Sequence, residues 1–152
     1  MECHEGATMI KTFRGLMAND TQDTIVLHTN DGSIGYRIVK FQVIGVSENI
    51  DYETTVKVYK ISQGTTFTDT IDFNDNTLLA AGLYGDSTSG TARPSQIVIF
   101  DNEIFNQDIY ITHKATSGTT AINYYIELEQ VKLDLGENTV ATLKDIRNKA
   151  VP

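Results

Sequence analysis

The alternation of apolar and polar side chains along the chain predicts β-strands rather than helices. Residues 122–133 have the clearest pattern, because side chains at every second position of a strand share one face. The apolar face would hold Ile122, Tyr124, Ile126 and Leu128, and the polar face Asn123, Tyr125, Glu127 and Glu129. After Gln130 the apolar positions change phase, which predicts a bulge or a move of the strand between two sheets.

Two other ranges, 36–46 and 53–61, alternate in a similar but less regular way. In the first we expect Val39, Phe41 and Val43 to share a buried face. Further strand candidates are 24–29, 67–73, 78–84, 96–100 and 107–113. The range 78–84 is rich in Leu and Ala and also fits a short helix capped by Asn76 or Thr77, but its strand-rich neighbours favour a buried strand.

The composition agrees with a β-rich fold. The chain has 20 Thr, 16 Ile and 10 Val among 152 residues, and β-branched side chains favour strands. Turn-forming residues separate the candidate strands, as at Asn30-Asp31-Gly32. About eight strands without intervening helices are typical of an antiparallel sandwich, and eight in two sheets is the number in a jelly roll. We therefore predict an all-β, jelly-roll-like antiparallel β-sandwich.

The end of the chain has a different pattern. Asn138 or Thr139 can cap a short helix in which Val140, Leu143 and Ile146 recur at helical spacing. About two turns of helix are not stable alone, so this helix must dock on its own sandwich or on a neighbouring subunit. We expect three parts: an N-terminal arm at 1–12, a sandwich domain at 13–137 and a helical tail at 138–152.

Charge and apolar content narrow the function classes. Twelve basic and 20 acidic residues leave a net charge of -8, which would repel phosphate backbones, so we expect no nucleic-acid partner. No apolar run approaches the roughly 18 residues that span a bilayer, so we expect no membrane partner. The start of the chain lacks the pattern of a signal peptide, and the single cysteine, Cys3, excludes an internal disulfide. We expect a soluble protein made in a cytoplasm.

Two groups of oxygen-bearing side chains could carry chemistry. Asp72, Asn74 and Asn76 match the opening of a calcium loop, but Thr77 replaces the required glycine and Leu83 the final glutamate, so a polar turn is the better interpretation. Glu127 and Glu129 would lie roughly 7 Å apart on one strand face and could serve glycoside hydrolysis. The chain has no Trp to stack on a sugar, so a solvated or subunit-facing surface is the better interpretation.

Histidines and nucleophiles support no catalytic site. His4 lies beside Cys3 in a terminal segment with nothing to fix metal geometry, and His28 and His113 are each expected to be hydrogen-bonded strand residues. The chain lacks a nucleophile-elbow motif, a P-loop and a dinucleotide-binding turn. We therefore predict neither an enzyme nor a protein that needs a cofactor or metal.

Several stretches of the sequence resemble small structural proteins of tailed bacteriophages from marine and cyanobacterial hosts. These stretches are 13–17 with 28–38, 99–110, 123–129 and 139–148. The resemblance implies a virion component, a capsid decoration or cement protein that binds the outside of the shell and bridges major capsid subunits. It also implies assembly in the bacterial host cytoplasm and a position on the capsid exterior. Many such proteins are symmetric trimers, so we expect a homotrimer.

On this hypothesis the partner of the chain is the major capsid protein. The candidate contact residues belong to the two terminal segments and to an exposed strand tyrosine, because short apolar segments at termini need a surface on which to dock. They are Phe13, Arg14, Leu16, Tyr125, Leu143, Ile146 and Arg147.

Two alternatives remain open at this stage. The first is a carbohydrate- or receptor-binding module of a tail or fibre, because jelly rolls host lectins as well as capsid proteins. The second is a small glycan-processing enzyme that uses Glu127 and Glu129.

Overall fold

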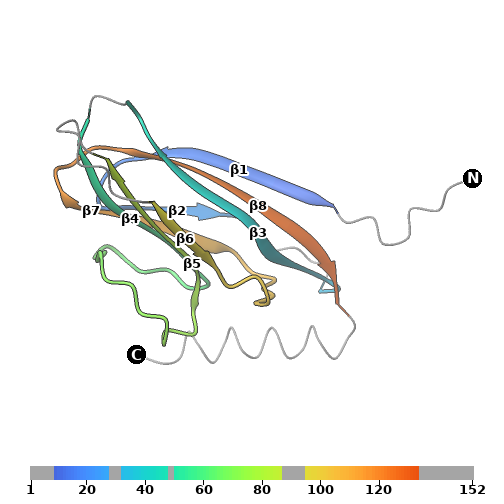
Figure 1. Ribbon diagram of the computed structural model, residues 1–152. Helices are drawn as coiled ribbons and strands as arrows, with labels where there is room; N and C mark the ends of the chain where they lie inside the picture. The colour runs from blue at the N-terminus through green and yellow to red at the C-terminus, as the bar shows by residue number, and fades with distance from the viewer. Residues whose placement is uncertain (1–8, 28–31, 48–49, 87–94, 134–152) are drawn as a thin grey trace, which may run out of the picture.

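The computed structural model describes residues 9–27, 32–47, 50–86 and 95–133, and in these ranges the chain forms eight β-strands and no helix. The strands are β1 (Ile10–Met17), β2 (Thr21–Ile25), β3 (Ile34–Gly45), β4 (Tyr52–Tyr59), β5 (Leu78–Asp86), β6 (Gln96–Ile99), β7 (Ile109–Ser117) and β8 (Ile122–Lys132). They build a three-stranded sheet, β1-β8-β3, and a five-stranded sheet, β2-β7-β4-β5-β6. All pairs are antiparallel, and Figure 1 shows the sheets as two layers, so the predicted β-sandwich is confirmed.

The strand order is that of a jelly roll with one change. The nested pairs β1·β8, β2·β7 and β4·β5 are those of a long hairpin rolled into two sheets. A regular jelly roll would place β6 beside β3. Here β6 bonds to β5 through Ala80 to Leu83, and it only approaches β3 across the corner of the sandwich. The three-stranded sheet therefore has two edge strands, β1 and β3.

The main core lies between the two layers. From the three-stranded sheet it receives Met17, Ile38, Phe41, Ile122, Ile126 and Leu128, and from the five-stranded sheet Val56, Val58, Leu79, Ala80, Ile109 and Ile111. On β8 every second residue from Ile122 to Leu128 is buried, as the alternation predicted. These side chains alternate because successive residues of a strand point to opposite faces.

The phase change lies on a different strand from the one predicted. Along the β3·β8 pair the register shifts between Ile38 and Lys40, so Val39 is an extra residue on β3. The bulge places Ile38 and Phe41 in the core, whereas Val39 was expected to share the face of Phe41. β8 itself stays paired within one sheet over its whole length.

Two further expectations differ from the structure. Residues 67–73 are not a strand but part of the β4–β5 connection, and the sequence pattern did not indicate β1. β1 begins at Ile10, inside the segment 1–12 that was expected to be an arm. The predicted helix at 138–152 lies outside the described residues.

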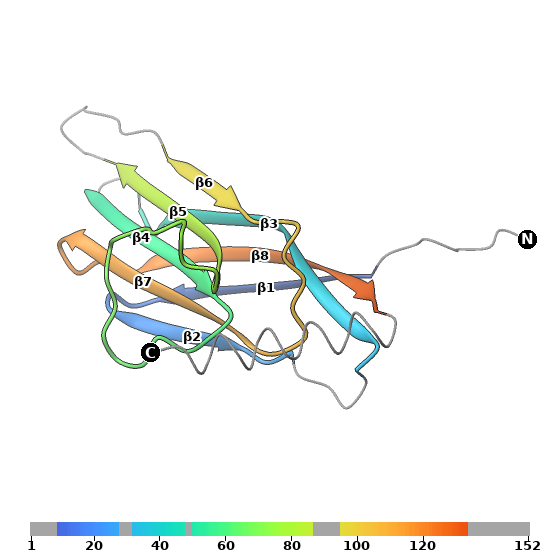
Figure 2. The same ribbon diagram turned by 90° about the horizontal axis from the view of Figure 1, so that it is seen from below.

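The β4–β5 connection, residues 60–77 and here called the strap, covers part of the outer side of the five-stranded sheet. Seen from below in Figure 2, the green strap crosses in front of β4 and β7. Beneath it Tyr59, Leu78 and Ala81 are buried and pack with Ile71 of the strap. In the described part of the chain, no helix has the length and apolar character that a membrane span needs.

Candidate interaction surface

The strap covers some of the outward-facing side chains of the five-stranded sheet, whereas Leu83 and Val98 on the same side are each 40% exposed. Lys57 is 3% exposed, and its Nζ donates to the Thr70 carbonyl oxygen at 2.6 Å and to Thr68 Oγ1 at 3.2 Å. Burial lowers the pKa of Lys57, while the charges of Asp69 and Asp75 act in the opposite direction. The part of this face around Lys57 is thus occupied by the chain's own residues.

The three-stranded sheet differs, because no described segment lies over its outward-facing side chains. We call this surface the outer face. The antiparallel register arranges its side chains in four rows, each with one residue from β1, β8 and β3 in that order. The rows are Ile10, Glu129 and Arg37; Thr12, Glu127 and Lys40; Arg14, Tyr125 and Gln42; and Leu16, Asn123 and Ile44.

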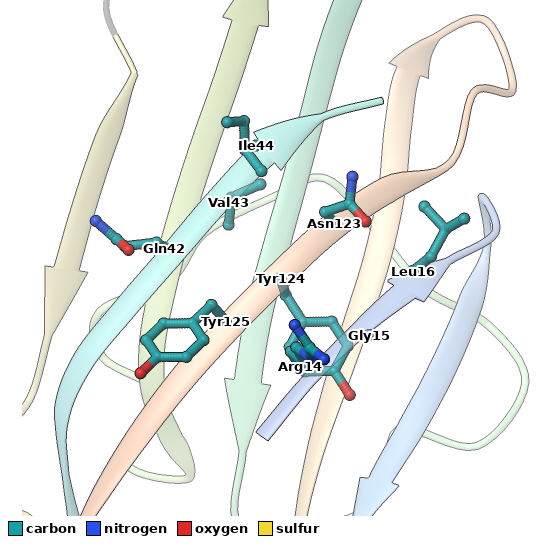
Figure 3. A pocket seen from close by; sticks show the side chains of 9 residues that line it. All are labelled: Arg14, Gly15, Leu16, Gln42, Val43, Ile44, Asn123, Tyr124 and Tyr125. Carbon is teal, nitrogen blue, oxygen red and sulfur yellow. The ribbon is translucent and has the colours of Figure 1, made fainter. Parts of the chain in front are cut away.

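A hollow of about 590 Å³ lies at the end of the outer face that carries the last two rows. Leu16 and Ile44 stand on either side of Asn123 in one row, and Arg14 and Tyr125 lie in the next (Figure 3). The remaining lining comes from Gln42 and from the inward-facing row of Gly15, Tyr124 and Val43.

The apolar side chains of this end are unusually open to solvent. Leu16 is 59% exposed and Ile44 is 63% exposed, although both are in strands of a well-packed sandwich. Because Asn123 is the residue between them on β8, they flank an amide that can donate and accept hydrogen bonds. The surface can therefore bury apolar area and satisfy polar groups of a partner at the same place.

The charged side chains elsewhere on the outer face have partners within the face. Arg37 Nε lies 2.6 Å from Glu129 Oε1 across β3 and β8. The Tyr125 hydroxyl donates to Glu127 Oε2 at 2.6 Å, and this bond raises the pKa of Tyr125. Lys40 Nζ lies 6.0 Å from the centre of the Tyr125 ring.

This network includes both Glu127 and Glu129. Each carboxylate has a partner on the same surface, one a phenol and the other a guanidinium. Both glutamates therefore take part in interactions within the outer face.

Arg14 is different from Arg37 and Lys40. It is exposed, and it has no hydrogen bond or ion pair with any residue in the described ranges. Its neighbour across the ladder is Tyr125, whose hydroxyl is bonded to Glu127. A free guanidinium beside a hollow can bind a carboxylate through two parallel hydrogen bonds.

The sequence named three of the residues that the fold brings together here. Arg14, Leu16 and Tyr125 share the outer face, and Arg14 and Tyr125 are directly opposite each other. Phe13 points the other way and packs against the core, so it is not part of this surface. The predicted contact residues Leu143, Ile146 and Arg147 lie outside the described residues.

Sequence reasoning missed Gln42, Ile44 and Asn123 as members of this surface. Each was placed on a strand, and Asn123 was assigned to the polar face of 122–133. What joins them to Arg14 and Leu16 is the pairing of β3 and β1 with β8. No local signal in the sequence reports which strands are neighbours.

The calcium-loop candidate is a pair of turns. Asp72 Oδ1 accepts from the Asn74 backbone at 2.9 Å, and Asp75 Oδ1 accepts from the Thr77 backbone at 2.9 Å. The Thr77 hydroxyl also donates to Asp75 Oδ1 at 2.6 Å. Both aspartates thus stabilise the strap, as expected of a polar turn.

The described histidine, His113, is fully buried between the two sheets. Its Nδ1 donates to the Ala18 carbonyl oxygen at 3.1 Å, and its Nε2 is bonded to Thr54 Oγ1. Burial lowers the pKa of His113. His113 is a hydrogen-bonded strand residue as predicted, whereas Cys3, His4 and His28 lie outside the described residues. Among those that the structure does describe, no three acidic, histidine or cysteine side chains cluster in a way that could hold a metal ion.

Comparison with known proteins leaves the fold and this surface as the basis for a function. No protein-family model matches the chain, and neither a curated protein nor a solved structure matches it.

Proposed function

We propose that this protein is a capsid decoration protein that binds the outside of a virion shell through its outer face. The observation that carries the proposal is the contrast between the two sheets. The strap covers the outward side of the five-stranded sheet around Lys57 and leaves Leu83 and Val98 exposed at its β5–β6 edge, whereas no described segment covers the outward side of the three-stranded sheet. A sandwich that leaves exposed leucine and isoleucine on one flat sheet has a surface suited to a protein partner.

Charge supports a position outside the shell rather than beside packaged DNA. The chain carries a net charge of -8, yet its outer face has the cations Arg14, Arg37 and Lys40 against the two glutamates of β8. With three cations against two glutamates, this face can accept an acidic partner surface although the chain as a whole is negatively charged. The partner in this proposal is the major capsid protein. A symmetric trimer would attach through three outer faces at once, so contacts that are weak singly would give strong binding together.

The proposal is tested by adding the purified protein to capsids that lack it. Saturable binding at a multiple of the shell's symmetry sites, with DNA released at a higher temperature, is the expected result. Absence of binding to the shell would overturn the proposal. Labelling the protein on intact virions would then locate it on the tail or collar.

The outer face is tested separately with two variants that remove exposed apolar groups. The combined change Leu16→Asn and Ile44→Asn should weaken capsid binding, because both side chains flank the hollow. Val26→Asn is the matched control, since Val26 is 64% exposed but lies just past β2 in the other sheet. Equal binding by the two variants would remove the outer face from the proposal.

A second candidate function is binding of a glycan, as in a receptor-binding module. The observation that favours it is the row of Arg14, Tyr125 and Gln42, in which an aromatic ring lies between a guanidinium and an amide (Figure 3). Aromatic rings with a polar edge contact amphipathic ligands well, and amides satisfy hydroxyl groups. Hits on a glycan array that disappear in Tyr125→Ala would support this function over capsid binding.

A further inference from the structure

The lysine and arginine side chains of the described residues differ in whether they already have a hydrogen-bond or ion-pair partner. Lys57 is bonded within the strap, Lys60 Nζ lies 3.4 Å from Glu103, and Lys114 Nζ lies 3.4 Å from Asp20. On the outer face Arg37 is paired with Glu129. Arg14, beside the hollow, has no such partner among the described residues.

Glu127, on the same face of the sheet, makes no hydrogen bond or ion pair with Arg14. Glu127 is two residues from Tyr125 on β8, and it accepts the Tyr125 hydroxyl at 2.6 Å. It also lies opposite Lys40 in the ladder. The Arg14 guanidinium thus has five donors that no described residue uses.

The apolar part of the hollow stands at a defined spacing from Arg14. Leu16 is two residues farther along β1 on the same face, which is about 7 Å in a strand. Ile44 faces Leu16 across Asn123, so the two form an apolar pair with an amide between them. A carboxylate and an aliphatic side chain on one extended segment have the same spacing when they are two residues apart.

From this match we infer that the hollow binds an extended acidic segment of the capsid partner, with a carboxylate on Arg14 and an aliphatic side chain between Leu16 and Ile44. The Gln42 and Asn123 amides, which line the same hollow, bond the backbone of that segment. The inference rests on the proposed function, and it specifies the chemistry of the partner: an acidic residue, any residue, then an aliphatic residue.

Charge complementarity favours this occupant over a basic one. A net charge of -8 attracts cations to the molecule as a whole, but at the hollow the local charge is that of an unpaired arginine. A basic side chain placed there would meet Arg14 directly. An acidic side chain would gain a bidentate pair, with the apolar contact beside it excluding water.

The first test compares two arginine variants in binding to capsids that lack the protein. Arg14→Gln should weaken binding roughly tenfold, the typical effect of removing one partner of a shielded charge pair. Arg37→Gln is the matched control, because it changes the net charge equally on the same face but removes a cation already paired with Glu129. Equal loss in both variants would overturn the subsite, since it would show that only total charge matters.

The second test does not depend on the capsid. The isotope-labelled full chain is titrated with the peptides acetyl-Glu-Thr-Leu-amide, acetyl-Gln-Thr-Leu-amide and acetyl-Glu-Thr-Ser-amide, and amide shifts are followed by NMR. The first peptide should shift Arg14, Leu16 and Asn123 at several-fold lower concentration than the other two. Equal shifts for all three peptides, or none, would overturn the inference.

The two tests separate the inference from the proposed function. Peptide binding without capsid binding would keep the subsite and remove the capsid as its partner. Capsid binding that is unchanged in Arg14→Gln would keep the function and remove the subsite. Stronger shifts with an acidic oligosaccharide, or self-association that Arg14→Gln abolishes, would overturn the peptide as the occupant and assign the hollow to a glycan or to a second copy.

Discussion

The Tyr124 hydroxyl of β8 donates a hydrogen bond to Asp23 of β2, with 3.2 Å between Oη and Oδ2. The bond joins the two sheets, because β8 belongs to one and β2 to the other. Tyr124 is 7% exposed, so its phenol ring is part of the core while its hydroxyl reaches the half-buried carboxylate. A bond of this kind fixes how the layers lie relative to each other at this edge of the sandwich.

Tyr124→Phe should destabilise the fold by about 1 kcal/mol, the usual effect of removing one hydrogen bond. Urea denaturation at neutral pH measures the change. Tyr125→Phe is the control, because it removes an equivalent hydroxyl from the solvent side of the same strand, and its effect should be smaller. A loss in Tyr125→Phe as large as that in Tyr124→Phe would contradict the assignment.

At alkaline pH the free energy of unfolding should depend on the ionisation of two buried tyrosines. Burial raises the pKa of Tyr124 and of Tyr59 from 10 to about 12, and negative charges beside each act in the same direction. Because the neutral phenol is favoured in the folded state, its stabilisation is complete below pH 10 and is lost as the pH rises to about 12. Denaturation between pH 9 and pH 12 should show this decline.

The matching spectroscopic result is a late tyrosinate signal. Absorbance titration of the folded protein should show a late signal near pH 12 from Tyr59 and Tyr124. In Tyr124→Phe and in Tyr59→Phe the delayed signal should shrink by one tyrosine. A single transition near pH 10 for all tyrosines would contradict this expectation.

His113 should make the protein less stable in mild acid. Burial lowers its pKa below 6.5, so the unfolded chain binds a proton that the folded chain does not. The stabilisation is present above pH 6.5 and is lost as the pH falls through the folded-state pKa. NMR titration of the imidazole should give a pKa below 6.5 that matches the decline in stability.

The hydrogen bond to Thr54 gives a second measure of the same site. Thr54→Val should destabilise the fold by about 1–3 kcal/mol at neutral pH, because it leaves the buried His113 Nε2 without its partner. Thr116→Val is the control, since Thr116 is exposed and its hydroxyl bonds Asp69 at the surface. An unchanged free energy of unfolding in Thr54→Val would show that the buried bond is not stabilising.

Lys57 should hold the strap without adding much to global stability. Lys57→Met keeps the alkyl chain but removes the bonds to Thr68 and Thr70, so hydrogen exchange in the strap should accelerate about tenfold for about 1.4 kcal/mol lost locally. The free energy of global unfolding should change little, because burying a charge is itself costly. Lys40→Met on the opposite sheet should leave strap exchange unchanged.

Gly15 should tolerate no larger residue while Tyr124 is in place. A Cβ atom added to Gly15 would lie 2.9 Å from the ring atom Cε2 of Tyr124, closer than carbon atoms approach. Gly15→Ala should therefore cost about 1–3 kcal/mol through overpacking. In the double variant Gly15→Ala with Tyr124→Val, the alanine should cost much less, and a fully additive result would contradict the steric explanation.

The strands with strict alternation could be predicted from the sequence. On β8 the buried and exposed sets agree with the apolar and polar sets, because a side chain's face on a strand depends only on its position in the chain. β1 was not predicted because its sequence lacks this alternation. Its apolar residues change faces, with Ile10 and Leu16 outward and Phe13 and Met17 inward, so no alternation is visible.

The wrong strand at 67–73 shows where the pattern misleads. Phe67 and Ile71 are apolar because they lie over the outward side of the five-stranded sheet, not because they belong to a strand of it. The backbone there finds partners among side chains: Lys57 donates to the Thr70 carbonyl oxygen. Burial alone does not distinguish a strand from a covering loop.

For the candidate surface, the sequence identified Arg14, Leu16 and Tyr125 one by one, together with the all-β class. Their grouping with Gln42, Asn123 and Ile44 depends on the pairing of β1 and β3 with β8. Alternation is local, so it can be seen in one strand. Strand pairing joins residues that are about a hundred positions apart, and it follows from the packing of the whole core and the closure of the loops between strands. Tertiary structure therefore decided which outward-facing residues form one surface and which of the two sheets leaves that surface open.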